Sequence, residues 1–549
     1  MENTERETME YDLVVVGAGP AGLSTAIKLK QLCDQNSKEI SICVVEKGSE
    51  VGAHILSGNV FDPKALNELI PDWKELGAPL NTPVKKDSVR YLLNESSAFS
   101  IPTMFATTFK NHGNYIMSLG NFCRWLGEYA EGLQIDVFPG FTASKLIYDN
   151  ETVIGVSTGD MGLDASGEKK PSFEPGIDLL AKYTVLSEGC RGHLGKQVIS
   201  QFNLDQDSDP QHYGIGFKEV WDISPDLHEE GLVVHTMGWP AAKGVLSGSY
   251  FYHGENNQAF LGYIVPLDYD NPHISPFDEF QQWKHQSSIK QYLEGGTRTA
   301  YGARALIKGG YQSIPKMHFP GGLLVGDDAG TMNFPRIKGT HTAMKSGMIG
   351  AESIYEELAK EESDKDIVNF QLNLKSSWLE KELHKARNFL PFIHKFGTLL
   401  GVALAGMDQL IFRGNLPFTL HHDQPDHDCL KEAKEMVDGA PSTIKEAAPK
   451  LFQIINNLGF RIVRIIMIEG SIKVLQFMIQ HRFGSIENGF YDLFGTDYAA
   501  IRYDFSYGFN DVLALGAGRS SFDKVYDIFL KTKLIRQSKG VKNFPISVV

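Results

Sequence analysis

The chain has 549 residues, of which 42% are hydrophobic and 22% are charged, and its formal net charge at pH 7 is −14. A chain of this length is too long for one hydrophobic core and predicts two to four domains. The acidic balance argues against nucleic-acid binding, because a protein that binds phosphate backbones needs a basic surface.

The first structural signal is a glycine-rich turn at residues 17–22. It follows the apolar run of residues 13–16, opens a helical stretch at residues 23–32, and is trailed by a second apolar strand that ends at Glu46. A dinucleotide-binding fingerprint requires this strand–turn–helix–strand context. We predict that a pyrophosphate sits at the helix start and that Glu46 accepts hydrogen bonds from an adenosine ribose. A glycine turn between two core strands is the structural alternative.

The middle of the chain predicts further pieces of the same sheet and a second sheet. Residues 111–133 turn into an amphipathic helix, residues 134–160 alternate like hairpin strands, and residues 181–192 form a strand that ends in an acid and glycines. Residues 212–314 alternate strand-like stretches with turns, which predicts an inserted antiparallel sheet on the substrate side.

A second glycine motif, at residues 321–330, distinguishes FAD from NAD. Its strand ends in Gly326 and Asp327, and the aspartate carboxylate would reach the ribityl chain of FAD. Residues 337–342 then open a helical run from Ala343 to Leu358, within a helical pattern that continues to about residue 412. The N–H groups at that helix start would stabilise an anionic reduced flavin ring. An Asp327 that merely caps a turn is the alternative.

The sequence predicts no transmembrane helix, because no segment has 18 uninterrupted apolar residues. The nearest candidate, residues 396–412, is interrupted by Asp408 and fits better in the plane of a membrane interface. The short acidic N-terminus indicates neither a signal peptide nor a transit peptide. We therefore expect a bacterial cytoplasmic protein or one whose presequence has been removed.

Over about residues 10–430 the chain resembles the electron-transfer flavoprotein:ubiquinone oxidoreductase family. The matching stretches are residues 52–58, 111–116, 188–194, 213–221, 267–272, 293–296, 301–306, 312–315 and 337–347. The resemblance implies an α/β fold with a Rossmann-type, glutathione-reductase-like FAD-binding domain, an inserted antiparallel β-sheet quinone domain and a helical C-terminal region. It also implies electron transfer from reduced electron-transfer flavoprotein through FAD to ubiquinone, at a membrane surface to which the protein attaches monotopically.

The motifs and the resemblance together give a set of candidate site residues. For FAD they are Gly17, Ala18, Gly19, Pro20, Ala21, Gly22, Glu46, Lys47, Gly52, Ala53, Leu56, Ser57, Gly58, Gly326, Asp327, Gly339, Thr340, His341 and Thr342. The resemblance places a quinone carbonyl against backbone groups of a glycine pair, which corresponds to Ser247 and Gly248. No catalytic acid or base is expected for one-electron steps. His341 is a candidate proton donor, and a histidine packed at a helix start is the alternative that we favour.

The resemblance also implies a division into domains. We expect a discontinuous FAD-binding domain at residues 1–65, 105–195 and 315–360, and a quinone-side domain at residues 66–104 and 196–314. A helical membrane-facing region would follow at residues 361–430, and a divergent region of unassigned role at residues 431–549. Apolar stretches at residues 101–109 and 396–420 are the candidates for membrane attachment.

The chain departs from the family at its C-terminal end. The family ends in a ferredoxin-like module whose cysteines bind a four-iron cluster, which needs about four thiolates. Here the five cysteines are scattered without a CxxC pair, and only Cys429 follows Cys190. We expect reduced thiols and no four-iron cluster. Electrons would then arrive from a separate ferredoxin-like subunit or pass directly into FAD.

Two other classes of protein stay open. An FAD-dependent isoprenoid (geranylgeranyl-type) reductase or an aromatic hydroxylase shares this fold, and a hydroxylase would need NAD(P)H to reduce the flavin. A flavin-bound scaffold that docks partners at the membrane is the non-enzyme alternative. For the electron-transfer function, the expected location is the cytoplasmic face of the inner membrane in a bacterium, or the mitochondrial inner membrane if a presequence has been removed.

Overall fold

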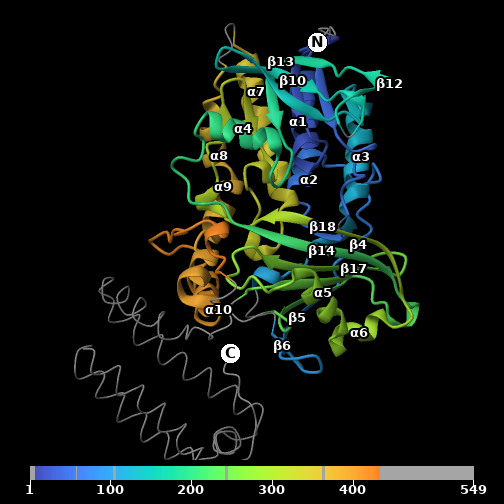
Figure 1. Ribbon diagram of the computed structural model, residues 1–549, viewed down its shortest axis with the longest axis vertical. Helices are drawn as coiled ribbons and strands as arrows, with labels where there is room; N and C mark the ends of the chain where they lie inside the picture. The colour runs from blue at the N-terminus through green and yellow to red at the C-terminus, as the bar shows by residue number, and fades with distance from the viewer. Residues whose placement is uncertain are drawn as a thin grey trace, which may run out of the picture. The chain divides into compact units, whose positions relative to one another are not determined.

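The computed structural model describes residues 6–432, except for residues 57, 103–106, 165, 242–244 and 361–364. The candidate residue Ser57 and all but the first two residues of the divergent region at 431–549 therefore lie outside the described residues. The described part contains two large sheets (Figure 1). Each sheet packs against a main hydrophobic core.

The first sheet has eight strands, six of which run in the order β19-β20-β13-β1-β2-β8, with β10 and β9 added beside β13. Their bounds are β1 (Thr8–Val16), β2 (Ile42–Glu46), β8 (Asp136–Pro139), β9 (Ala143–Asp149), β10 (Thr152–Thr158), β13 (Asp178–Leu186), β19 (His318–Phe319) and β20 (Gly322–Leu324). β1 is parallel to β13 and β2, β2 to β8, and β13 to β20. The centre of the sheet is apolar on both faces, as expected for parallel strands covered by helices.

Helices cover this sheet. They are α1 (Pro20–Gln35), α2 (Lys64–Leu69), α3 (Leu119–Gly132), α4 (His193–Gln201) and α7 (Thr340–Leu358). α1 and α7 pack closely at Gly347, where a β-carbon would lie 2.3 Å from the Ala21 carbonyl oxygen and 2.6 Å from Thr25 Oγ1. The helix that follows the first glycine motif is thereby fixed against the helix that follows the second.

The second sheet has seven strands in the order β18-β14-β17-β16-β15-β5-β6. They are β5 (Lys86–Leu92), β6 (Ala98–Ile101), β14 (Tyr213–Asp222), β15 (Leu232–Gly238), β16 (Gly248–His253), β17 (Gln258–Pro266) and β18 (Thr297–Ile307). The expected antiparallel sheet is present, with one difference: β15 pairs with β5 in parallel. That pair brings residues 86–101 into the same sheet as residues 213–307.

Each face of the second sheet is covered. α5 (Pro276–His285) and α6 (Ser287–Leu293) contribute Phe280, Trp283 and Ile289 to the core on one face. A small sheet of β3 (Gly58–Phe61), β7 (Tyr115–Ser118) and β4 (Thr82–Pro83) contributes Val60 and Ile116 to a third core, which also contains Phe260 of β17. β11 (Met161–Leu163) and β12 (Lys169–Glu174) form a separate hairpin.

The C-terminal part of the described chain is helical but broken. It consists of α8 (Asn369–Ser376), α9 (Trp378–Ala386), α10 (Phe389–Met407) and a short π-helix η6 (Asp408–Phe412), and α10 is kinked at Gly397, where φ is 75°. The 3-10 turns are η1 (Thr107–Phe109), η2 (Pro225–Leu227), η3 (Tyr311–Ser313), η4 (Gly326–Asp328), η5 (Phe334–Arg336) and η7 (Asp426–Asp428). Among the described residues, none of the helices combines the length and apolar character that crossing a bilayer requires.

The close crossing of α1 and α7 gives a test of the fold. Gly347→Ala would push a methyl group into the backbone of α1, so we expect a loss of stability of about 1–3 kcal/mol, the usual cost of overpacking. Gly406→Ala is the matched control, because a β-carbon there meets no other part of the structure within 4 Å. It should raise stability by about 0.5–1 kcal/mol, as alanine does in a helix. Thermal unfolding of both variants compares them, and equal midpoints would contradict the packing.

Candidate flavin and quinone site

The candidate FAD residues gather at one edge of the first sheet. β1, β2, β13 and β20 are mutually parallel through their shared neighbours, so the residues that follow Val16, Val45, Leu186 and Leu324 lie along the same edge. The two glycine motifs, about three hundred residues apart in sequence, touch there. A β-carbon on Gly326 would lie 2.7 Å from Cβ of Ala21.

The three glycines of the first motif are required for different reasons. Gly17 has φ of 104°, and its β-carbon would lie 2.6 Å from the carbonyl oxygen of Ser187. A β-carbon on Gly22 would lie 2.1 Å from the carbonyl oxygen of Gly17. At Gly19 a β-carbon would meet no atom of the described part of the chain within 4 Å. The protein's own packing thus explains Gly17 and Gly22, while the space beside Gly19 is open to a ligand.

Gly19 is also the N-cap of α1, and it makes no side-chain cap. Pro20 occupies the first turn of that helix and Ala21 is buried. The first N–H groups of a helix have no acceptor within the helix. An open space in front of such an N-terminus fits the pyrophosphate of a dinucleotide, because free N–H groups and the helix dipole both favour an anion.

Glu46 is held at the same edge by two backbone groups. Its Oε2 accepts from the N–H of Ala18 at 3.1 Å and its Oε1 accepts from the N–H of Gly48 at 2.7 Å. Each carboxylate oxygen has a further lone pair, so the side chain can also accept from the hydroxyls of a ribose. Lys47 and Ala53 are exposed beside it.

The loop at residues 52–58 runs from this edge to the second sheet. Gly52 has φ of 86° and packs against the carbonyl oxygen of Gly120. Leu56 lies beside Gly302 of β18, since a β-carbon on that glycine would be 3.3 Å from Leu56 Cδ2. Gly58 is buried in β3 against the ring of Phe260.

Asp327 lies in a setting that calls for a polar partner. Its Oδ1 is buried and has no hydrogen-bond partner among the residues that the structure describes. Burial raises its pKa to about 6, against the lowering effect of the charges of Arg304 and Lys218. Burial, together with the charge of Arg304, lowers the pKa of Lys218 to about 8. A buried carboxyl oxygen without a partner is costly, and a ribityl hydroxyl would supply the missing hydrogen bond.

The neighbouring Asp328 has a different surrounding. It accepts from the N–H of Glu188 at 3.3 Å, and burial beside Glu188 raises its pKa well above the usual range. Glu188 in turn accepts from the N–H groups of Leu194 and Gly195 at the start of α4. This pair of acids connects the turn after β20 to the turn after β13.

The start of α7 offers free N–H groups. Gly339 is its N-cap without a side-chain cap, and the helix begins at Thr340, three residues before the expected Ala343. Thr340 Oγ1 accepts from Asn59 Nδ2 at 2.6 Å, and Thr342 Oγ1 donates to the carbonyl oxygen of Gly339 at 2.8 Å. The backbone N–H groups of the first turn have no intrahelical acceptor, so they can face an electron-rich edge of a ligand.

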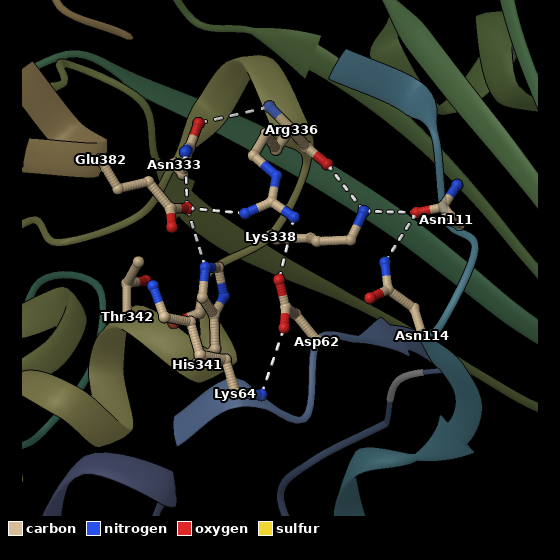
Figure 2. Close-up of polar contacts among 11 residues, drawn as sticks. Asp62, Lys64, Asn111, Asn114, Asn333, Arg336, Lys338, His341, Thr342 and Glu382 are labelled. Carbon is tan, nitrogen blue, oxygen red and sulfur yellow. Dashed lines mark hydrogen bonds and ion pairs between the residues drawn. The ribbon is translucent and has the colours of Figure 1, made fainter. Parts of the chain in front are cut away.

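His341 is engaged by the protein itself. Its Nε2 lies 2.8 Å from Glu382 Oε1 (Figure 2). Its ring lies parallel to that of Trp378, with the ring centroids 5.8 Å apart. Glu382 also accepts from Asn333 at 2.8 Å and from Arg336 at 2.9 Å. Burial alone would raise the pKa of Glu382, but these partners, His341 first, hold it well below its usual range. The contacts are those of a packed histidine at a helix start.

Lys338 and Asn111 are two further site residues that the sequence alone does not indicate. Lys338 is buried, and its Nζ donates to Asn111 Oδ1 at 2.5 Å (Figure 2). Asn111 Nδ2 donates to Asp87 Oδ1 at 2.6 Å. Burial, with the charge of Arg336, lowers the pKa of Lys338 to about 7. Both residues stand in stretches that match the family, but a pair 227 positions apart carries no local signal.

Ser247 and Gly248 lie at the start of β16 in the second sheet. Ser247 is buried, and a β-carbon on Gly248 would meet none of the described residues within 4 Å. Gly248 pairs with Met237 of β15 and Ile264 of β17. The second sheet reaches the FAD residues through β14 and β18, whose Lys218 and Arg304 lie close enough to Asp327 to shift its pKa.

Three family models match parts of the chain. One described as ETF-QO, ubiquinone-binding, matches residues 213–306, which span β14 to β18. One described as an NAD(P)-binding Rossmann-like domain matches residues 15–73. One described as a membrane bound beta barrel domain matches residues 467–549, which lie outside the described residues.

Curated relatives match most of the chain. The electron transfer flavoprotein-ubiquinone oxidoreductase of Pseudomonas aeruginosa is 58% identical over 435 residues, which is 78% of this chain and 79% of that protein. A probable enzyme of the same name from Acinetobacter baylyi is 53% identical, with the same coverage of both chains. The mitochondrial protein of Bos taurus is 48% identical over 79% of this chain and 72% of its own length.

Solved structures share the fold at low identity. A geranylgeranyl bacteriochlorophyll reductase-like protein from Thermoplasma acidophilum is 16% identical with a TM-score of 0.53, and the match covers 80% of this chain and 99% of that one. A flavin-dependent brominase variant is 14% identical with a TM-score of 0.50, over 81% and 99% of the two chains.

The fold is that of an FAD-type flavoprotein, and the chain is an oxidoreductase. It belongs to the electron transfer flavoprotein-ubiquinone oxidoreductase family. The fold class and the family expected from the sequence are thus confirmed. The roles of the individual site residues stay predictions.

The open space at Gly19 gives a test of the FAD site. Gly19→Val should fold as the wild type does and retain little flavin, because its side chain would occupy the space expected for the pyrophosphate. Gly132→Val is the matched control, since a β-carbon at Gly132 also meets nothing within 4 Å and the residue ends α3. Flavin content per chain after gel filtration is the measurement. A yellow Gly19→Val protein at full occupancy would mean that the site assignment is wrong.

Proposed function

We propose that this protein passes electrons from reduced electron-transfer flavoprotein through a bound FAD to ubiquinone. One observation carries the proposal. The edge that gathers both glycine motifs adjoins β14 and β18, where Lys218 and Arg304 act on Asp327, and those strands belong to the segment that matches the ubiquinone-binding family model. The edge of the first sheet that carries the dinucleotide motifs and the second sheet, which matches the ubiquinone-binding model, therefore meet at the carboxyl group of Asp327.

Bound FAD would supply the redox chemistry, since it accepts and releases electrons singly or in pairs. We propose that residues 17–22, with Glu46 and Lys47, hold the adenosine and the pyrophosphate. Gly326 and Asp327 would hold the ribityl chain. One side of the flavin would be lined by the loop residues Gly52, Ala53, Leu56, Ser57 and Gly58. Gly339, Thr340, His341 and Thr342 would present backbone N–H groups to the flavin ring. These groups favour negative charge on the ring and so tune its potential.

We propose Ser247 and Gly248 as the quinone contact. Their support is the open space above Gly248 and the position of both residues in the segment that matches the ubiquinone-binding model. The proposed domains are those of the sequence analysis. The two sheets supply the FAD-binding and quinone-side domains, α8 to η6 supply the helical region, and residues 431–549 keep no assigned role.

A membrane surface is the proposed location. Leu410, Ile411 and Phe412 of η6 are exposed large apolar residues. η6 also contacts η1, which lies in the other candidate stretch, residues 101–109. Phe396, by contrast, is buried with Phe392 and Ile393 and serves the interior. The relatives include bacterial and mitochondrial proteins, and we propose the cytoplasmic face of the inner membrane or the mitochondrial inner membrane accordingly.

The route by which electrons arrive is part of the proposal. All five cysteines, Cys33, Cys43, Cys123, Cys190 and Cys429, are free thiols in the structure, and the first three are buried. No two of them stand within nine residues of each other in the sequence, whereas a four-iron cluster needs about four thiolates, several of them closely spaced. This supports a chain without a four-iron cluster, and a separate ferredoxin-like subunit or direct transfer into FAD as the two routes.

The reductant separates the proposed function from its alternative. We expect reduced electron-transfer flavoprotein, alone or with a ferredoxin-like subunit, to bleach the bound flavin under anaerobic conditions, and ubiquinone to restore its colour. NADPH should leave the flavin oxidised. Stopped-flow absorbance measures all three reactions. Reduction by NADPH without reduction by electron-transfer flavoprotein would favour an isoprenoid reductase or hydroxylase, and a flavin that no reductant bleaches would favour the scaffold.

The exposed apolar residues test the membrane proposal. Replacing Leu410, Ile411 and Phe412 together with serine should weaken binding to phospholipid vesicles by roughly tenfold or more, because full burial of each such side chain contributes about 1.5–3 kcal/mol. Val368→Ser with Leu372→Ser is the matched control, since both residues are exposed at another place, before and within α8. Vesicle co-sedimentation measures binding. An equal loss in both variants would contradict the assignment of η6.

A further inference from the structure

Three histidines from distant segments converge away from the FAD residues. His212 precedes β14, His394 lies in α10, and His422 lies in the segment that follows η6. Their ring centroids are 4.6 Å (212 to 394), 4.4 Å (212 to 422) and 5.2 Å (394 to 422) apart. One nitrogen from each ring lies within 4.8 Å of the other two.

The hydrogen bonds fix the protonated nitrogens of two of these rings. His422 Nε2 lies 2.9 Å from the carbonyl oxygen of Gly309, which can only accept, so this nitrogen carries the proton. His394 Nε2 lies 2.7 Å from Asp268 Oδ2, and Asp268 also pairs with Lys308 at 3.1 Å, so it is an ionised acceptor. In the neutral rings both Nδ1 atoms are then bare, and they face each other at 3.3 Å.

The third ring adds a third bare nitrogen. His212 Nδ1 is hydrogen-bonded to Asp426 Oδ1, and the other oxygen of this carboxylate accepts from the N–H of Tyr213 at 2.6 Å. The carboxylate is thus the acceptor and His212 Nδ1 is the donor. Within the described part of the chain, His212 Nε2 is left buried without a hydrogen-bond partner, on a side chain that is 2% exposed.

Three bare nitrogens on rings packed this closely need a positive partner. A proton shared between the two Nδ1 atoms would satisfy only those two. A water molecule has two protons and would satisfy two of the three nitrogens. A metal ion satisfies all three at once.

The spacing and the outer contacts fit a metal ion. Zn–N bonds of about 2.0–2.1 Å in a tetrahedral site place two ligand nitrogens roughly 3.3–3.4 Å apart, which matches the 3.3 Å between the Nδ1 atoms of His394 and His422. Each ring also gives its other N–H to a carboxylate or a carbonyl oxygen, the arrangement that orients metal-bound imidazoles. Two carboxylates, Asp268 and Asp426, stand against one ammonium, that of Lys308, so the surroundings favour a cation.

We propose that His212, His394 and His422 bind a divalent transition-metal ion, with Zn²⁺ as its occupant. Imidazole nitrogens suit this class of ion, and three of them leave a fourth position for water. His394 is the most exposed of the three, with 22% of its side chain accessible, and offers the path by which the ion enters. The ion would join the second sheet, α10 and the segment at residues 414–432. The proposed metal site does not depend on the electron-transfer proposal.

The test uses the full-length chain, loaded with FAD and free of any histidine tag. After treatment with a chelator, the protein is incubated with Zn²⁺, passed through gel filtration and analysed for metal. We expect about one zinc per chain. Co²⁺ in place of Zn²⁺ should give the visible bands of a tetrahedral nitrogen site in a difference spectrum against the chelated protein. Wild-type protein that keeps no zinc, or Co²⁺ bands of an octahedral aqua-type site, would overturn the proposal.

Variants locate the ion. His212→Gln should lose the bound zinc, and Asp426→Asn should weaken zinc binding by about 10–100-fold, the usual effect of removing the group that orients a metal-bound imidazole. His427→Gln is the matched control, because His427 lies close in sequence and is 82% exposed. It should bind as the wild type does. Equal zinc in all four proteins would show a surface ion and contradict the site; if His212→Gln does not fold, Asp426→Asn decides by the same criterion.

Discussion

The parallel alignment of β1 with β2 and β13, and of β13 with β20, is the constraint on which the candidate site depends. It brings four strand ends to one edge, although the strands come from residues 8–16, 42–46, 178–186 and 322–324. The close approach there is possible only because Gly17 and Gly22 lack side chains, as their β-carbons would collide with backbone atoms of Ser187 and Gly17. Each candidate FAD contact follows from this arrangement.

The local parts of the site could be predicted from the sequence, because their signals are local. Each of three features directly follows an apolar strand: the turn at residues 17–22, Glu46, and the pair Gly326 and Asp327. Because the carboxyl ends of parallel strands lie at one edge of a sheet, these features are expected to lie together. The sequence predicts that α7 begins at Ala343, three residues after its actual start at Thr340. Gly339 is a weak N-cap, and the helix begins directly after it without the polar cap that usually marks a boundary.

Other features could not be predicted, because they depend on residues far apart in the chain. Lys338 meets Asn111, and His212 meets His394 and His422, and no spacing in the sequence announces either group. The positive charges of Lys218 and Arg304 affect the pKa of Asp327 only because the second sheet adjoins the first. The proposal of Ser247 and Gly248 as quinone contacts rests on the family resemblance, since neither residue carries a chemical signal of its own.

Polar contacts also hold the last described segment against the rest of the chain. Arg387 donates to the carbonyl oxygens of Gly414 and Leu416, and Asn388 accepts from the N–H of Leu420. Further on, Asp426 bonds to His212 and Tyr213 at the start of β14. The helical region is thereby joined to the second sheet, and the proposed metal ion would strengthen that junction.

The most direct measurement is an experimental structure of the flavin-loaded protein. We expect the adenosine ribose on the carboxylate of Glu46, a ribityl hydroxyl on Asp327 Oδ1, and the flavin ring at the backbone N–H groups that begin α7. A flavin bound elsewhere, or a flavin that leaves Asp327 Oδ1 without a contact, would contradict it.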